Sequence, residues 1–224
     1  MLEQGITYNT SMGLVAGATM VLLVVFTRVV QRPDRGSIEG WAWMFAALGL
    51  ILAITGTHMT LTWPLKQIDG AACCAADNVS FGEPAMIYGV LVFFGAIAII
   101  RGGRAALDRE VPFDIVATVR PMLYAGAFAG IGLIMIGIAG LEFGMWGPPP
   151  PDEPIARIMG DSVLERFYVA GAYMITGVAA ITAPFAPENR IVARIFAATL
   201  LVGGMMWTFL GFTLFYGHIG FFPH

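Results

Sequence analysis

The chain contains the stretch PMLYAGAFAGIGLIMIGIAGLEFGMW, residues 121–146, in which Glu142 is the only charged residue. As an α-helix this stretch would measure about 39 Å, at a rise of 1.5 Å per residue. The hydrocarbon layer of a bilayer is only about 30 Å thick. Residues 121–146 are therefore long and apolar enough to cross a membrane, and the rest of the chain repeats this pattern.

Composition places the whole protein in the same class. Of its 224 residues, 58% are hydrophobic and only 12% are charged, and the mean hydropathy is +0.77. Such values are typical of integral membrane proteins. We predict an all-α, polytopic fold that forms one transmembrane domain over residues 1–224, with outer loops at 64–83 and 147–165. The predicted transmembrane helices are residues 11–31, 41–63, 84–101, 121–146, 166–185 and 194–217.

The distribution of basic residues predicts the orientation. Nine of the twelve Lys and Arg residues follow the first, third and fifth predicted helices. Because cytoplasmic loops of membrane proteins are rich in Lys and Arg, these nine are expected in the cytoplasm. Both termini are then expected on the extracytoplasmic side. The other three basic residues are Lys66, Arg157 and Arg166.

The second, fourth and sixth predicted helices end in similar sequences. Each has a Gly, a polar side chain one or two residues later, then an aromatic residue and a Pro. This pattern suggests three related helical hairpins. The three endings are Gly56, His58, Trp63 and Pro64; Gly140, Glu142, Trp146 and Pro148; and Gly217, His218, Phe222 and Pro223.

Five ionisable residues are expected in one layer near the outer face. Counting along the helices from their cytoplasmic ends puts His58, Glu142 and His218 about 25 to 36 Å away. Glu83 and Glu165 begin their predicted helices at the outer face. Histidine nitrogens and carboxylate oxygens together suit zinc, copper, iron or manganese. We therefore predict a divalent or redox metal ion in this layer. Its candidate ligands are His58, Glu83, Glu142, Glu165 and His218.

Other readings of these residues stay open. Glu83 and Glu165 begin predicted helices, where the helix dipole and free N–H groups stabilise a carboxylate without a metal. The two histidines could be interfacial side chains, or the five groups could form a proton-linked polar cluster. Glu142 fits no such alternative well, because the last turn of a helix disfavours negative charge.

Several further features have a structural reading as well as a functional one. Cys73 and Cys74 are adjacent in the first outer loop; they could bind copper, pair with a partner's cysteine, form a local disulfide, or be free or simply packed thiols. The second outer loop could be a lid or a docking surface for a partner subunit. Trp63 and Trp146 are expected in the aromatic belts of the membrane interfaces. Glycines four residues apart, such as Gly126 and Gly130, predict close helix packing.

Familiar catalytic motifs are absent from the sequence. It contains no phosphate-binding glycine loop, no serine-nucleophile motif, no paired-histidine zinc helix and no haem-attachment motif. The net charge of −3 and the short arginine-containing loops exclude a nucleic-acid partner. A secondary transporter is disfavoured too, because its helices are ordinarily broken around a central polar site.

Two short segments resemble a family of uncharacterised six-helix integral membrane proteins of actinobacteria and archaea. They are HMTLTWPL, residues 58–65, and FGEP, residues 81–84. The resemblance covers most of the chain and implies a prokaryotic plasma membrane, but the family carries no known activity.

Two functions follow as hypotheses. In the first, the protein is a membrane subunit of a larger respiratory or copper-dependent oxygenase complex and carries the His/Glu metal cluster. In the second, it is an accessory subunit without metal or chemistry of its own. Both imply contacts with lipids and with other membrane protein subunits.

Overall fold

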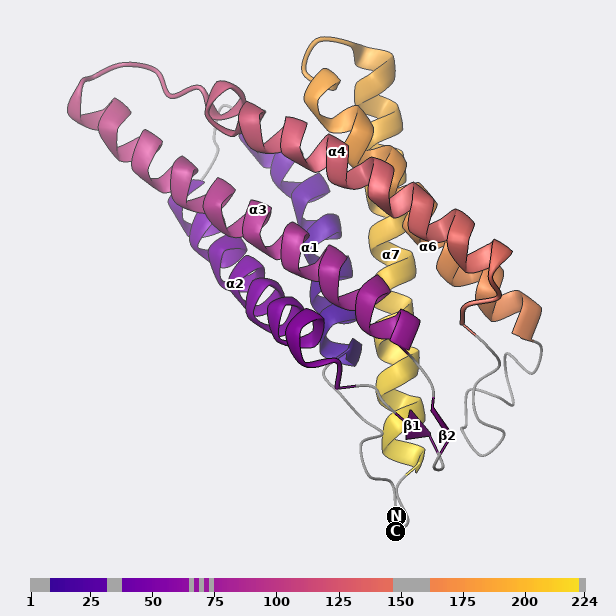
Figure 1. Cartoon of the computed structure of the whole chain (residues 1–224). Helices are drawn as coiled ribbons and strands as arrows, with labels where there is room; N and C mark the ends of the chain where they lie inside the picture. Colours follow the sequence, from indigo (N-terminus) through magenta and orange to yellow (C-terminus); the bar gives the residue numbers. More distant parts are fainter. Residues whose placement is uncertain are drawn as a thin grey trace.

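Six helices make up almost all of the computed structural model, which describes residues 9–31, 38–64, 67–68, 71–72, 75–146 and 162–221 (Figure 1). All six are long and apolar enough to cross a membrane, so the prediction of an all-α, six-helix membrane fold is confirmed. A two-residue antiparallel pair, β1 (Gln67–Ile68) and β2 (Ala71–Ala72), and the 3-10 turn η1 (Ala183–Phe185) complete the elements. The helices are α1 (Asn9–Val30), α2 (Ile38–Thr62), α3 (Ala75–Asp108), α4 (Ile115–Glu142), α6 (Ser162–Thr182) and α7 (Arg190–Phe221).

Helix α3 differs most from its predicted range of 84–101. It begins at Ala75, so residues 75–83, expected in an outer loop, are helical. The prediction began the helix at Pro84. Pro84 instead lies inside the helix, where it lacks the N–H that would bond to the carbonyl of Ser80. That carbonyl therefore needs another donor.

The closest helix packing occurs in three antiparallel pairs: α2 with α3, α4 with α6, and α1 with α7. The sequence suggested hairpins of the first with the second helix, the third with the fourth and the fifth with the sixth, and this grouping is not the one that packs most closely. The pair α1/α7 instead joins the beginning and the end of the chain. In Figure 1 the start of α1 and the end of α7 accordingly lie at the same end of the bundle.

Each pair is held together where glycines let two backbones touch. In α2/α3, Gly49 and Gly56 of α2 pack against α3, and a Cβ at Gly49 would lie 2.6 Å from the backbone nitrogen of Phe93. In α4/α6 a Cβ at Gly130 would lie 2.7 Å from the carbonyl oxygen of Gly177. In α1/α7 a Cβ at Gly211 would lie 2.7 Å from the nitrogen of Leu14. We call these three contacts the glycine seams; they fix the rotation of every helix in its pair.

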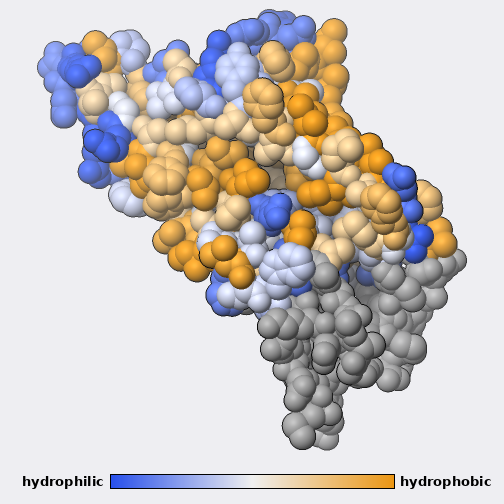
Figure 2. All heavy atoms as spheres, in the orientation of Figure 1, coloured by the Kyte–Doolittle hydropathy of each residue, from blue (hydrophilic) through white to orange (hydrophobic). Residues whose placement is uncertain are grey.

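The two ends of the bundle differ in their charges. At the end where α3 stops and α4 starts, Arg104 pairs with Glu39 at 2.5 Å and Arg120 pairs with Glu188 at 2.8 Å. We call this the arginine end; hydrophilic residues gather there at the top of Figure 2, and a largely hydrophobic band lies below them. The opposite end, where α2 and α4 stop and α3 and α6 start, contains the proposed metal ligands.

Candidate functional site

The five predicted ligands all lie toward this opposite end of the bundle, because each belongs to a helix that starts or stops there. They belong to five different helices, α2, α3, α4, α6 and α7. His218 is part of α7, but its side chain is outside the described residues. The shared end agrees with a common layer, while the direction of each side chain depends on the rotation of its helix.

His58 lies on the outward face of α2. The buried residues of this helix, among them Gly49, Leu52, Gly56 and Met59, form one face that packs into the bundle. His58 follows Gly56 by two residues, a rotation of about 200°, and its side chain is exposed. The imidazole therefore points away from α3, and its Nδ1 lies 3.4 Å from the hydroxyl of Thr62 on the same helix.

Glu142 is oriented in the same way on α4. The buried residues Gly130, Gly137 and Gly140 define the inner face of this helix. Glu142 is the last residue of α4 and is exposed; it lies about 140° around the helix from Gly137. The structure thus places His58 and Glu142 on outward faces of two different helix pairs.

The two remaining glutamates have different surroundings. Glu83 is exposed and lies in the third turn of α3, because the helix begins at Ala75 and its first-turn acid is Asp77. The helix-dipole reading of Glu83 is therefore wrong. Glu165 does lie in the first turn of α6 and is half-buried, so the dipole stabilises its carboxylate.

Among the described residues, no three His, Cys, Asp or Glu side chains come close enough together to hold a metal ion. The described part of the chain therefore does not bring His58, Glu83, Glu142 and Glu165 together as one shell. Cys73 and Cys74, and residues 147–161 of the predicted lid, fall outside the described residues. The five-ligand metal site remains a prediction.

The same end of the bundle contains buried polar groups that the sequence did not single out. Asn78 and Ser80, in the first two turns of α3, are 0% and 1% exposed. Tyr173 of α6 is also buried, and its hydroxyl donates to the carbonyl oxygen of Ser80 at 2.6 Å. This is the carbonyl that Pro84 leaves without a helical partner. The hydroxyl of Tyr173 in α6 therefore supplies the hydrogen bond that Pro84 in α3 cannot donate.

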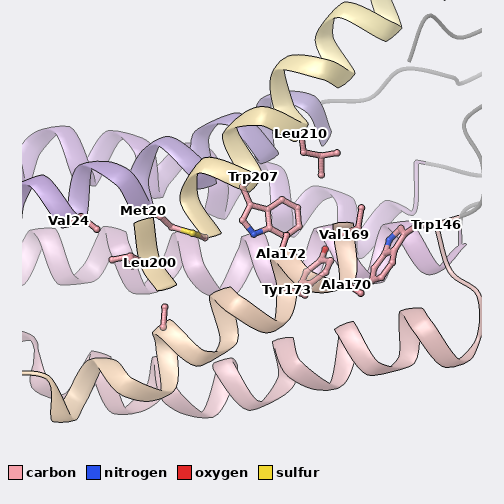
Figure 3. Close-up of a cluster of buried hydrophobic side chains, with 11 residues drawn as sticks. Met20, Val24, Trp146, Val169, Ala170, Ala172, Tyr173, Leu200, Trp207 and Leu210 are labelled. Carbon is pink, nitrogen blue, oxygen red and sulfur yellow. The ribbon is translucent and has the colours of Figure 1, made fainter. Parts of the chain in front are cut away.

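Four aromatic rings pack around this contact and form what we call the aromatic core: Phe81, Trp146, Tyr173 and Trp207. Trp146 stacks on Tyr173 with 5.4 Å between ring centroids, and Trp207 meets Tyr173 edge-on at 4.8 Å. The indole N–H of Trp207 donates to the hydroxyl of Thr176 at 3.1 Å. Figure 3 shows Trp207, Tyr173 and Trp146 in a row. We therefore call this the aromatic end of the bundle.

Trp146 reaches the core because the chain reverses after α4. Met145 donates its backbone N–H to Gly140 at 3.0 Å, and Gly144 has a φ of 66°, which together form a Schellman ending. Trp146 then has a φ of 58° and folds its ring back onto Gly140, where any Cβ would collide with the indole. The ring is only 8% exposed, so its assignment to an interfacial aromatic belt is wrong.

Two signals in the sequence could have pointed to this core. Pro84 in an apolar helix requires a donor for the carbonyl four residues earlier. Gly140 lies six residues before a tryptophan, at a turn rich in glycine. Neither signal identifies Tyr173 as the partner, because α3 and α6 are distant in sequence.

Comparison with known proteins gives a family and no activity. No curated protein and no solved structure matches the chain. One family profile matches residues 3–220, nearly the whole chain. The protein therefore belongs to the family DUF981, described as a protein of unknown function.

Proposed function

We propose that this protein is a subunit of a larger membrane complex, of the respiratory or copper-dependent oxygenase kind, which it joins as an accessory subunit. The observation that carries the proposal is the position of His58 and Glu142 on outward faces of the bundle. Ionisable side chains on the surface of a membrane protein are costly when lipid surrounds them. A partner subunit that offers polar groups at these positions lowers that cost.

The surroundings of His58 support a protein partner. Ile54 and Leu61, which lie on the same outward face of α2, are 61% and 77% exposed. A partner that covers this face would need a largely apolar surface with one hydrogen-bonding group opposite His58. Interfaces between transmembrane helices have this composition. Because Glu142 belongs to a different helix pair, a partner with more than one transmembrane helix fits best.

The test is to extract the complex from its native membrane in mild detergent and to compare particle mass and subunit content across variants. We expect the native chain to migrate well above the mass of its own 24.0 kDa with bound detergent. His58→Ala together with Glu142→Gln should release it from the same partners. Asp108→Asn, at the arginine end, is the control and should leave the assembly intact. Migration of the native chain as a free monomer would refute the proposal.

A metal centre is the second candidate function, and the placement of all five predicted ligands at one end favours it. Zinc, copper, iron or manganese would require further ligands from His218 or from a partner, since the described residues do not supply three. Elemental analysis of protein purified without chelator tests this. A stoichiometric metal that is lost in the double variant His58→Ala, Glu142→Ala would support a metal centre. The absence of metal from the intact complex would refute this second proposal.

A further inference from the structure

Trp146 has a strained backbone and an unsatisfied donor, and its ring fits against a glycine. Its φ of 58° is in the left-handed region, which bulky residues rarely adopt. Its indole N–H is buried and has no hydrogen-bond acceptor among the residues that the structure describes, whereas buried polar groups are almost always paired. Its ring leaves no room for a side chain at Gly140. Strained residues cluster at functional sites and switch regions, and an unsatisfied buried donor calls for an explanation.

What holds Trp146 in place is its contact with the aromatic core. The ring stacks on Tyr173 with an angle of only 15° between the planes. Tyr173 in turn donates its hydroxyl to Ser80, and Asn78 is fully buried in the same turn of α3. Trp146 therefore covers the ring whose hydroxyl reaches the polar first turns of α3.

We propose that Trp146 is a movable plug that closes the polar interior at the aromatic end. In the closed state the indole packs on Tyr173 and Gly140, as in the structure. In the open state the turn after α4 relaxes and the indole moves outward, which gives small polar molecules access to Ser80 and Tyr173.

Trp63 provides a comparison for the open state, because it combines a positive φ with an exposed ring. It follows the end of α2, has a φ of 46°, and yet is 45% exposed. The open state of Trp146 loses its stacking on Tyr173. It gains an acceptor for the indole N–H, because water and lipid headgroups at a membrane interface both supply acceptors. The open state thus exchanges one stabilising contact for another, and we expect it to be the minor state of the two.

The covering role is tested by thiol labelling at Ser80, which is only 1% exposed. The parent carries Ser80→Cys with Cys73→Ser and Cys74→Ser, in detergent, and the probe is a small charged methanethiosulfonate. Trp146→Ala should speed labelling roughly ten- to a thousandfold, since a minor open state is typically 0.1–10% populated. Gly140→Ala, which pushes the ring out, should act in the same direction. Trp63→Ala is the matched control and should change nothing.

Movement itself is tested without changing the core. The native chain is labelled with 5-fluorotryptophan, and Trp146→Phe identifies the resonance of Trp146 by its loss. We expect that resonance to show exchange between two environments and to be broadened by a water-soluble paramagnetic agent. A single sharp resonance shielded from that agent would overturn the plug, and so would equal labelling rates in the Trp146→Ala and parent proteins.

Discussion

The ends of α2 and α4 have similar sequences but are built differently. Each has a glycine, an ionisable residue two positions later, and a tryptophan with positive φ: Gly56, His58 and Trp63 in α2, and Gly140, Glu142 and Trp146 in α4. Trp63 is 45% exposed, whereas Trp146 is 8% exposed.

The difference comes from what occupies the space beside each glycine. A Cβ at Gly56 would collide with the backbone of α3 at Met86, so the neighbouring helix fills that space. At Gly140 the space is filled by the chain's own Trp146. Helix α4 can use Gly140 in this way because Gly130 and Gly137 already form its seam with α6. A repeated sequence pattern therefore does not imply a repeated contact.

The largest expected effect concerns Gly56. Gly56→Ala places a methyl group against the backbone of α3, which cannot move aside as a side chain can. We expect a loss of about 3 kcal/mol in the free energy of unfolding, at the upper end of typical overpacking costs, measured by SDS titration. Gly132→Ala is the control, since no atom of the described residues lies within 4 Å of its added Cβ. Equal stability of the two variants would contradict the seam.

The next largest difference in the free energy of unfolding is expected between the alanine variants of the two tryptophans. Trp146→Ala should cost about 2 kcal/mol, below the usual 3–5 for a buried tryptophan, because the change also removes a buried N–H that has no acceptor in the described part of the chain. Trp63→Ala, at an exposed position, should stay within about 0.5 kcal/mol of the native protein. Both are measured in the same titration, and a larger loss for Trp63→Ala would reverse our assignment of the buried ring.

A double-mutant cycle sharpens the comparison further. Gly140→Ala and Trp146→Ala act on the same contact, so the second change should relieve the first, with a coupling of about 1–2 kcal/mol. Gly56→Ala and Trp63→Ala act on different contacts and should be additive within about 0.5 kcal/mol. Additivity in the first cycle would mean that the indole does not rest on Gly140.

The smallest effect is expected at the arginine end. The Arg120–Glu188 pair spans 2.8 Å, but its side chains are 38% and 61% exposed. Glu188→Gln should therefore cost no more than about 0.5 kcal/mol, and raising the salt concentration should reduce the difference. A loss comparable to that of Trp146→Ala would show that this end contributes as much stability as the aromatic end.

The sequence predicted the parts of the site that depend on position along a helix. Counting residues along apolar spans places His58, Glu142 and Glu165 at the same end, and their helices do stop or start there. It could not predict direction, because His58 on the outward face and Met59 on the inward face are neighbours in sequence. Only the glycine seams, which are contacts between two helices, decide that rotation.

The six helices were determined by the hydropathy and length of the sequence alone. Each helix must be long and apolar enough to cross a layer of fixed thickness, and this requirement applies to each helix separately. The pairing α1/α7, the Tyr173 to Ser80 bond and the burial of Trp146 were decided by the tertiary structure. They depend on which backbones approach closely enough to touch and on which donor reaches the carbonyl that Pro84 leaves unpaired. Both are properties of two helices together, so neither helix carries the information by itself.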